Sequence, residues 1–116
     1  MSRSTSNSND RGSSQQRAVR RQWLVDTYRA DVDVQAFKID DEVMYFCVPV
    51  GQGKPACRCF RCGKALTVDT LTVDRIIPGV KGGTYRRNNI RPACATCNFS
   101  TGGQLGALQR ALKAVA

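Results

Sequence analysis

The sequence predicts one small α+β domain in which a helix precedes a β-rich core and a second helix closes the chain. Three observations support this fold class. Two stretches are rich in strand-forming residues, two flanking segments show helical spacing of apolar residues, and four of the six cysteines form two C-x-x-C pairs. A chain of 116 residues buries only a modest core. The cysteines are therefore expected to add to its stability.

The N-terminal region is expected to be a disordered basic tail followed by a helix. Residues 1–14 are mainly Ser, Asn, Arg, Asp and Gly, with Met1 as the one apolar residue, so they cannot bury enough surface to order themselves. Residues 15–29 then predict a helix, with Trp23 as the anchor on the core. Its apolar residues are Val19, Trp23, Leu24 and Tyr28. We expect residues 15–116 to form a single domain.

The segment from Glu42 to Pro49 predicts a strand, because it contains Val43, Tyr45, Phe46 and Val48. A Pro- and Gly-rich loop is expected to follow it as far as Pro55. Cys47 lies within the apolar run, so we expect it to be a buried and inert thiol.

Cysteine spacing predicts a zinc site in the core, which spans residues 57–116. A C-x-x-C pair lets two thiolates of one turn bind one tetrahedral ion. We expect a reducing cytoplasm, since no apolar signal segment opens the chain, and zinc is then favoured over disulfides. The alternatives are four unrelated buried cysteines, or Cys57 replacing Cys59 as a ligand. The predicted zinc ligands are Cys59, Cys62, Cys94 and Cys97.

Between the two cysteine pairs, the sequence predicts two antiparallel strands joined by a long loop. Residues 66–77 are dense in Thr and Val and end at Pro78, residues 81–83 are glycine-rich, and residues 89–92 form the returning strand. After the second pair, apolar residues at helical spacing predict an amphipathic helix. These are Leu105, Leu108, Leu112 and Val115.

The charge distribution predicts a polyanionic partner. The formal net charge is +9, from 18 basic and 9 acidic residues, and four thiolates on one zinc ion would reduce it to about +7. Asp74 is the last acidic residue, whereas seven basic residues follow it. A polyanion is the natural partner of such a stretch, although a basic face kept for solubility is the alternative. No apolar run is long enough to span a membrane.

The motifs from Cys59 to about Gly103 resemble the HNH endonuclease family. Residues 73–78 read Val-Asp-Arg-Ile-Ile-Pro, followed by a Gly-Gly pair at 82–83, Asn-Ile at 89–90 and Cys-Ala-Thr-Cys-Asn at 94–98. The family usually places Asp-His followed shortly by Pro, then a Gly-Gly loop, then Asn with an aliphatic residue, and then C-x-x-C-Asn or C-x-x-C-His. The resemblance implies a ββα-metal core. The upstream Arg-rich helix also resembles small HNH proteins of tailed phages, which implies a phage origin and the host cytoplasm.

The resemblance implies a role for each matching residue. Asp74 and Asn98 would be ligands of a catalytic Mg²⁺ or Mn²⁺ ion, since such hard cations prefer oxygen ligands. Asn89 would hydrogen-bond across the loop. The ordinary alternatives are a turn former for Asp74, a loop cap for Asn89 and a helix N-cap for Asn98.

Arg75 departs from the family pattern, because it stands where a histidine normally deprotonates the attacking water. The chain contains no histidine. An arginine stays protonated and offers no lone pair, so Arg75 is expected to hold the scissile phosphate instead. Tyr85 is a conceivable proton acceptor.

The resemblance therefore implies a divalent-metal-dependent DNA endonuclease, which attacks phosphorus with a metal-bound water. The alternative is a non-catalytic zinc module that binds DNA or a phage packaging assembly. In either case, we expect salt-sensitive DNA binding with little direct reading of bases. The predicted phosphate-binding residues are Lys81, Arg86, Arg87 and Arg91.

Overall fold

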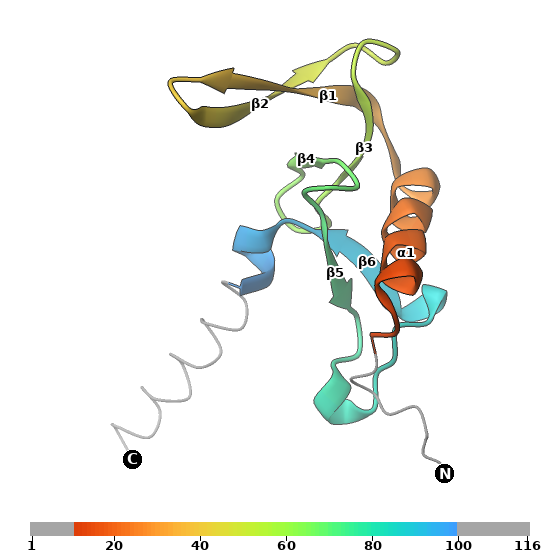
Figure 1. The fold of residues 1–116 in the computed structure, drawn as a ribbon. Helices are drawn as coiled ribbons and strands as arrows, with labels where there is room; N and C mark the ends of the chain where they lie inside the picture. Colours follow the sequence, from red (N-terminus) through yellow and green to blue (C-terminus); the bar gives the residue numbers. More distant parts are fainter. Residues whose placement is uncertain (1–10, 100–116) are drawn as a thin grey trace, which may run out of the picture.

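The computed structural model describes residues 11–99, which form the helix α1, six strands, two short 3-10 helices and a helical segment at 95–99. Four strands form one sheet in the order β2-β1-β3-β4, and β5 pairs with β6 in a second, two-stranded sheet. Figure 1 shows the β1–β2 hairpin at one end of the molecule and the loop that joins β5 to β6 at the other end. This α+β architecture confirms the predicted fold class.

Helix α1 spans Ser14–Thr27 and begins at a capping box. The Ser13 hydroxyl accepts a hydrogen bond from the Gln16 amide, and the Gln16 side chain accepts one from the Ser13 amide. The helix confirms the predicted one, although it ends two residues earlier. Its fully buried residues are Leu24 and Val25, whereas the predicted anchor, Trp23, is only partly buried. Most of the predicted tail lies outside the described residues.

Strand β1, Arg29–Ile39, pairs with β2, Glu42–Val48, in a tight hairpin. The turn consists of Asp40 and Asp41, which both have positive φ angles, 51° and 67°. Positive φ at both central residues is the requirement of a type I′ hairpin turn. The predicted strand at 42–49 is confirmed. Strand β1 was not predicted, although Ala30, Val32 and Val34 alternate with polar residues along it.

Strand β3, Lys54–Arg58, pairs with β1 through an irregular register between Arg29 and Asp33. The Arg29 guanidinium compensates for this irregularity by donating to the carbonyls of Ala30, Val32 and Ala56. It also forms an ion pair with the buried Asp33. Arg29 and the amides of Gly51 and Gly53 hydrogen-bond to this carboxylate and lower its pKa. The predicted loop as far as Pro55 is therefore too long, since β3 begins at Lys54.

The predicted strand at 66–77 is wrong as a continuous element. Strand β4 is only Ala65–Leu66, and β5 covers Thr72–Arg75. Between them, the amides of Thr70 and Leu71 donate to the Thr67 carbonyl, and the Thr67 amide donates to the Thr70 hydroxyl. Local threonine hydrogen bonds thus replace the sheet ladder at a sequence of high strand propensity.

Strand β6, Ile90–Ala93, pairs antiparallel with β5, which confirms the predicted return strand. We call this pair the β5–β6 ribbon. The loop within it contains the 3-10 helices η1, Gly79–Lys81, and η2, Arg87–Asn89. Residues 95–99 are helical, and the predicted amphipathic helix at 105–115 lies outside the described residues.

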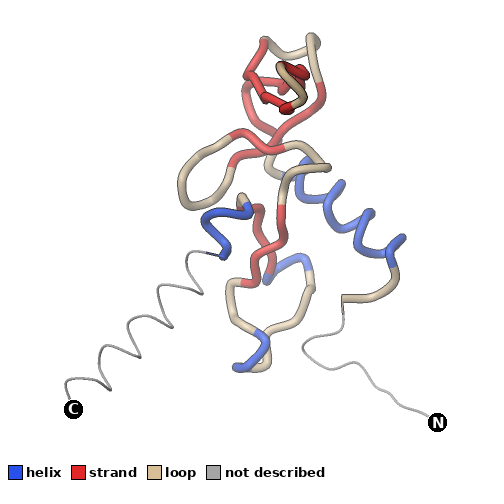
Figure 2. Tube along the Cα trace, turned by 60° about the vertical axis from the view of Figure 1, so that its left-hand side comes forward, coloured by secondary structure: helices blue, strands red, loops and turns tan. Residues whose placement is uncertain are grey.

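The core lies where α1 packs against β6 of the ribbon and against β1 and β3 of the larger sheet. Figure 2 shows α1 running beside the ribbon in a second view. The buried apolar residues that form this cluster are Leu24, Val25, Cys57, Cys59, Leu66, Leu71, Ile90, Ala93 and Cys94. Cys47 is not among them. It is exposed on β2, which contradicts the predicted buried thiol, because no other described segment covers β2 at this position.

Within residues 11–99, no helix is long and apolar enough to cross a membrane.

Candidate functional site

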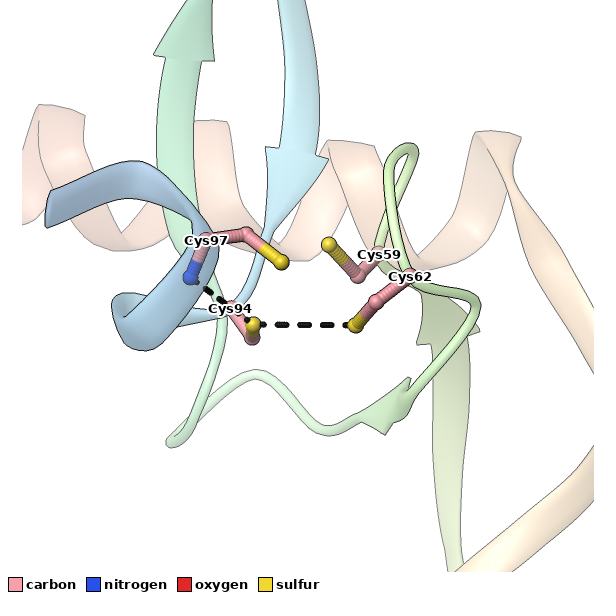
Figure 3. Close-up of side chains that lie close together, drawn as sticks. All are labelled: Cys59, Cys62, Cys94 and Cys97. Atoms are coloured by element: carbon pink, nitrogen blue, oxygen red, sulfur yellow. Dashed lines mark hydrogen bonds between the residues drawn. The ribbon is translucent and has the colours of Figure 1, made fainter. Parts of the chain in front are cut away.

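The four predicted zinc cysteines converge between the two sheets, and we call them the cysteine cluster. Cys59 and Cys62 lie in the turn between β3 and β4, whereas Cys94 and Cys97 follow β6 (Figure 3). Their sulfur atoms all lie within 4.8 Å of one another. The Cys62 and Cys94 sulfurs are 3.8 Å apart, which matches the roughly 3.8 Å between thiolates that share a tetrahedral zinc with Zn–S bonds of about 2.3 Å.

Backbone hydrogen bonds shape both cysteine turns. The Arg61 amide donates to the Cys59 sulfur at 3.5 Å, and the Cys97 amide donates to the Cys94 sulfur at 3.3 Å. The Phe60 amide donates to the Pro92 carbonyl, so the first turn is bonded directly to β6. These hydrogen bonds hold the two cysteine turns side by side around the cluster.

The acid–base chemistry of the thiols also fits a metal. Burial acts to raise the pKa of Cys59, but hydrogen bonds from Cys62, Cys94 and Arg61 outweigh it and lower the pKa to about 6. The Cys94 thiol and its neighbours, by contrast, raise the pKa of Cys97 to about 12. Four crowded thiols cannot all ionise alone, whereas a central divalent cation would stabilise all four thiolates.

Cys57 is excluded from the cluster, which removes it as an alternative ligand. It lies fully buried on β3 and is absent from the group of converging sulfurs. Burial raises its pKa to about 11, so it remains a neutral thiol.

Asn89 closes the loop of the ribbon. Its side-chain oxygen accepts from the Ile77 amide at 2.8 Å, and its side-chain nitrogen donates to the carbonyls of Ile77 and Thr84. Gly83 packs directly against the Ile77 backbone, where only glycine fits, because a Cβ at this position would lie 1.6 Å from the Ile77 carbonyl oxygen. Gly82 has a φ of +85° and provides the left-handed bend before it. The Gly-Gly pair and Asn89 thus form one structural unit.

Asp74 and Arg91 face each other as paired residues of β5 and β6. The Arg91 Nε donates to the Asp74 carboxylate at 2.7 Å, and about 20% of the Asp74 side chain is exposed. The Arg91 guanidinium also lies 3.6 Å from the ring centroid of Phe60, which belongs to the first cysteine turn. One arginine therefore links the candidate catalytic carboxylate to the cysteine cluster.

Asn98 lies beside the same strand. Its side-chain nitrogen donates to the Thr72 hydroxyl at 3.1 Å. Thr72 and Asp74 are two residues apart on β5, so they project from the same face. Asp74 and the Thr72 hydroxyl that binds Asn98 thus belong to one face of the ribbon.

Arg75 contacts the glycine-rich loop. Its guanidinium lies 3.4 Å from the Gly83 carbonyl oxygen and 4.5 Å from the Tyr85 ring centroid. Arg20 of α1 also lies over the Tyr85 ring, at 4.6 Å. Sequence reasoning did not assign a role to Arg20, Phe60 or Thr72. The only available signal was the run of arginines in α1, because ring contacts between distant segments leave no sequence spacing.

The predicted phosphate-binding residues are distributed around the loop. Lys81 ends η1 and is exposed, as are Arg86 and Arg87. The Arg87 guanidinium lies 5.1 Å from the centroid of the Trp23 ring. Arg91 differs from these three, because its charge is already paired with Asp74.

Residues 59–107 match the HNH endonuclease family. This segment is therefore similar to an HNH domain. It contains the cysteine cluster, the ribbon and the Asn89 loop, whereas α1, the β1–β2 hairpin and most of β3 precede it. No curated protein and no solved structure matches the chain. The HNH match supports a nuclease family, and the four-cysteine cluster supports a metal such as zinc.

Proposed function

We propose that this protein is a DNA endonuclease that hydrolyses phosphodiester bonds with a divalent Mg²⁺ or Mn²⁺ ion on its HNH domain. The observation that carries the proposal is that Asp74 and the Thr72 hydroxyl that binds Asn98 share one face of the ribbon, within the segment that matches the family. When bound, the cation would polarise the phosphate and lower the pKa of a coordinated water. Structural zinc in the cysteine cluster would hold the ribbon in place.

The residues of the ribbon have separable roles in this proposal. Asp74 and Asn98 would hold the cation, and Asn89 would keep the loop in its binding shape. Arg75 cannot accept a proton, so its permanent charge would bind the phosphate. Arg91 forms an ion pair with Asp74 in the absence of the cation. When the cation binds the Asp74 carboxylate, the Arg91 guanidinium would bind a phosphate oxygen instead.

The Asp74–Arg91 ion pair also favours a second candidate function, a DNA-binding module without nuclease activity. In that case, Arg91 would neutralise the Asp74 carboxylate permanently, and DNA binding would not depend on a catalytic histidine.

An acidic protein, such as a phage packaging subunit, would bind the same basic face. A pull-down that survives high salt and recovers one defined protein would support such a partner.

A plasmid-nicking assay tests the proposed activity. Zinc-loaded protein is incubated with supercoiled plasmid and Mg²⁺ or Mn²⁺, beside the Asp74→Asn and Arg75→His variants. We expect slow nicking by the wild type, none by Asp74→Asn, and an increase of roughly 10²-fold or more in Arg75→His, since a general base contributes about 10² to 10⁴ in rate.

The Asp74→Asn variant separates the two functions, because it preserves the shape of the side chain and removes its charge. Equal nicking by the wild type and Asp74→Asn would identify a contaminating nuclease and contradict the proposal. No nicking by the wild type, with stronger DNA binding by Asp74→Asn, would establish the binding module instead.

A further inference from the structure

A cavity beside β5 is lined by four arginines outside the matched HNH segment. Helix α1 and the residues before it form one wall, and Thr72, Tyr85 and Asn98 lie on the other side. The arginines that line it are Arg11, Arg17, Arg20 and Arg21. We call this the α1 cavity, and among residues 11–99 no carboxylate lines it.

The periodicity of α1 explains why the arginines gather there. Arg17, Arg20 and Arg21 are spaced i, i+3 and i+4, so they share one face of the helix. Leu24 and Val25 of the same helix are fully buried, which fixes how the helix is rotated against the core. The Arg20 guanidinium also donates to the Arg11 carbonyl at 3.0 Å, which holds the preceding residues against the helix.

Tyr85 connects the α1 cavity to the ribbon. Its ring contacts the guanidinium of Arg20 from α1 and that of Arg75 from β5, at 4.6 and 4.5 Å. Asn98 lines the same cavity and donates a hydrogen bond to Thr72. Thr72 is two residues before Asp74 on β5, so both side chains project from the same face of the strand. The cavity arginines are thus adjacent to the candidate catalytic face, and Arg20 among them packs on a residue of its loop.

We propose that the α1 cavity binds the phosphate backbone of a DNA strand next to the candidate catalytic site. Four like charges around one cavity favour a ligand with several negative charges, and the guanidinium group matches phosphate oxygens in bidentate geometry. A chain of phosphodiesters meets both conditions, whereas a single small anion would neutralise only part of the charge. This inference rests on the proposed DNA binding, and it makes α1 part of the DNA-binding surface.

The inference is tested by removing two of the cavity charges. Arg17→Gln/Arg21→Gln leaves the Arg20 contact with Tyr85 intact. The matched control is Lys38→Gln/Lys64→Gln, which removes the same charge at exposed positions outside the cavity. Binding of a short labelled DNA duplex is measured by fluorescence anisotropy from low to high salt, without added divalent cation.

Phosphate contacts determine the dependence of DNA affinity on salt. Each lost phosphate contact reduces the steepness of the plot of log binding constant against log salt concentration by about 0.9. We therefore expect the slope of the arginine variant to fall by about 2 and its dissociation constant to rise roughly tenfold or more. The lysine control should change the slope by less than about 1. Arg17→Lys/Arg21→Lys keeps both charges and should retain the wild-type slope with weaker binding, because the bidentate geometry is lost.

The outcomes distinguish this inference from the proposed nuclease activity. Equal losses of slope in the arginine variant and the lysine control would overturn the α1 cavity as a phosphate site, even if Asp74-dependent nicking is present. A selective loss in the arginine variant would support the site, even if the wild type cuts nothing. Circular dichroism melting curves verify that each variant is folded.

Discussion

The β1–β2 hairpin and the β5–β6 ribbon are both antiparallel strand pairs, yet they are held together differently. The hairpin turns within two residues, whereas the strands of the ribbon are separated by residues 76–89 and depend on Asn89 to close the loop. Every side chain of β2 except Val48 is exposed. In β6, Ile90, Pro92 and Ala93 are buried. The hairpin is therefore maintained by local pairing, and the ribbon by contacts with the rest of the molecule.

The two regions also carry opposite charge. Asp40, Asp41 and Glu42 cluster at the tip of the hairpin, whereas Lys81, Arg86 and Arg87 surround the loop of the ribbon. A polyanion would be attracted to one end of the molecule and repelled by the other. Two antiparallel strand pairs of one molecule thus differ in both burial and charge.

The largest expected contrast between the two regions follows loss of the metal. Cys94→Ser, or removal of zinc by a chelator, should unfold the ribbon, because a structural zinc ion contributes roughly 10–16 kcal/mol of apparent binding free energy. Hydrogen exchange measured residue by residue would show lost protection in β5 and β6. Cys47→Ser changes an exposed cysteine of the hairpin and serves as the control. Full protection of β5 and β6 in the chelated protein would contradict the structural role of the metal.

A smaller effect is expected when the closure of the ribbon loop is removed. Asn89→Ala leaves the Ile77 amide and two carbonyls without the partners that they have in the wild type. We expect a loss of about 1–3 kcal/mol in the free energy of unfolding, measured by denaturant titration. The neighbouring Asn88 is exposed, so Asn88→Ala should stay within about 0.5 kcal/mol of the wild type. Equal effects of the two substitutions would show that Asn89 does not hold the loop.

The smallest expected effect is a gain in stability at the hairpin tip. Asp41 has a φ of +67°, a left-handed conformation that glycine adopts without strain. Asp41→Gly should therefore increase the free energy of unfolding by up to about 1 kcal/mol. The lost ion pair with Lys38 is exposed and 3.9 Å long, so it contributes little. A lower thermal midpoint for this variant would indicate that the Asp41 side chain stabilises the turn.

Local patterns in the sequence predicted the elements that depend on local spacing. Helix α1, strand β2 and the converging cysteines follow from periodicity and from the C-x-x-C motif. Strand β1 has equally clear alternation at Ala30, Val32 and Val34, but it follows the helix after a single residue, and the predicted helix extended over its start. The break in the predicted strand at 66–77 depends on side-chain hydrogen bonds between Thr67 and Thr70, which compete with a high strand propensity.

The site was predicted less completely than the fold, because most of its contacts join distant segments. The motif gave Asp74, Asn89 and Asn98 as positions, but no sequence pattern indicated that Arg91 would pair with Asp74. Strand register determines that pair, and register depends on where β5 and β6 begin. The exposure of Cys47 was missed for a related reason, since an apolar run predicts a strand but not a layer to cover it.

The spacing of the cysteine cluster has a consequence for the order of assembly during synthesis on the ribosome. Residues of the β1–β2 hairpin can pair as soon as they emerge, since their contacts are close in sequence. Cys59 and Cys62, by contrast, must wait for Cys97 before a four-sulfur site exists. The nascent chain therefore holds two of the four cluster thiols and an incomplete core until Cys97 has been made, late in the matched segment.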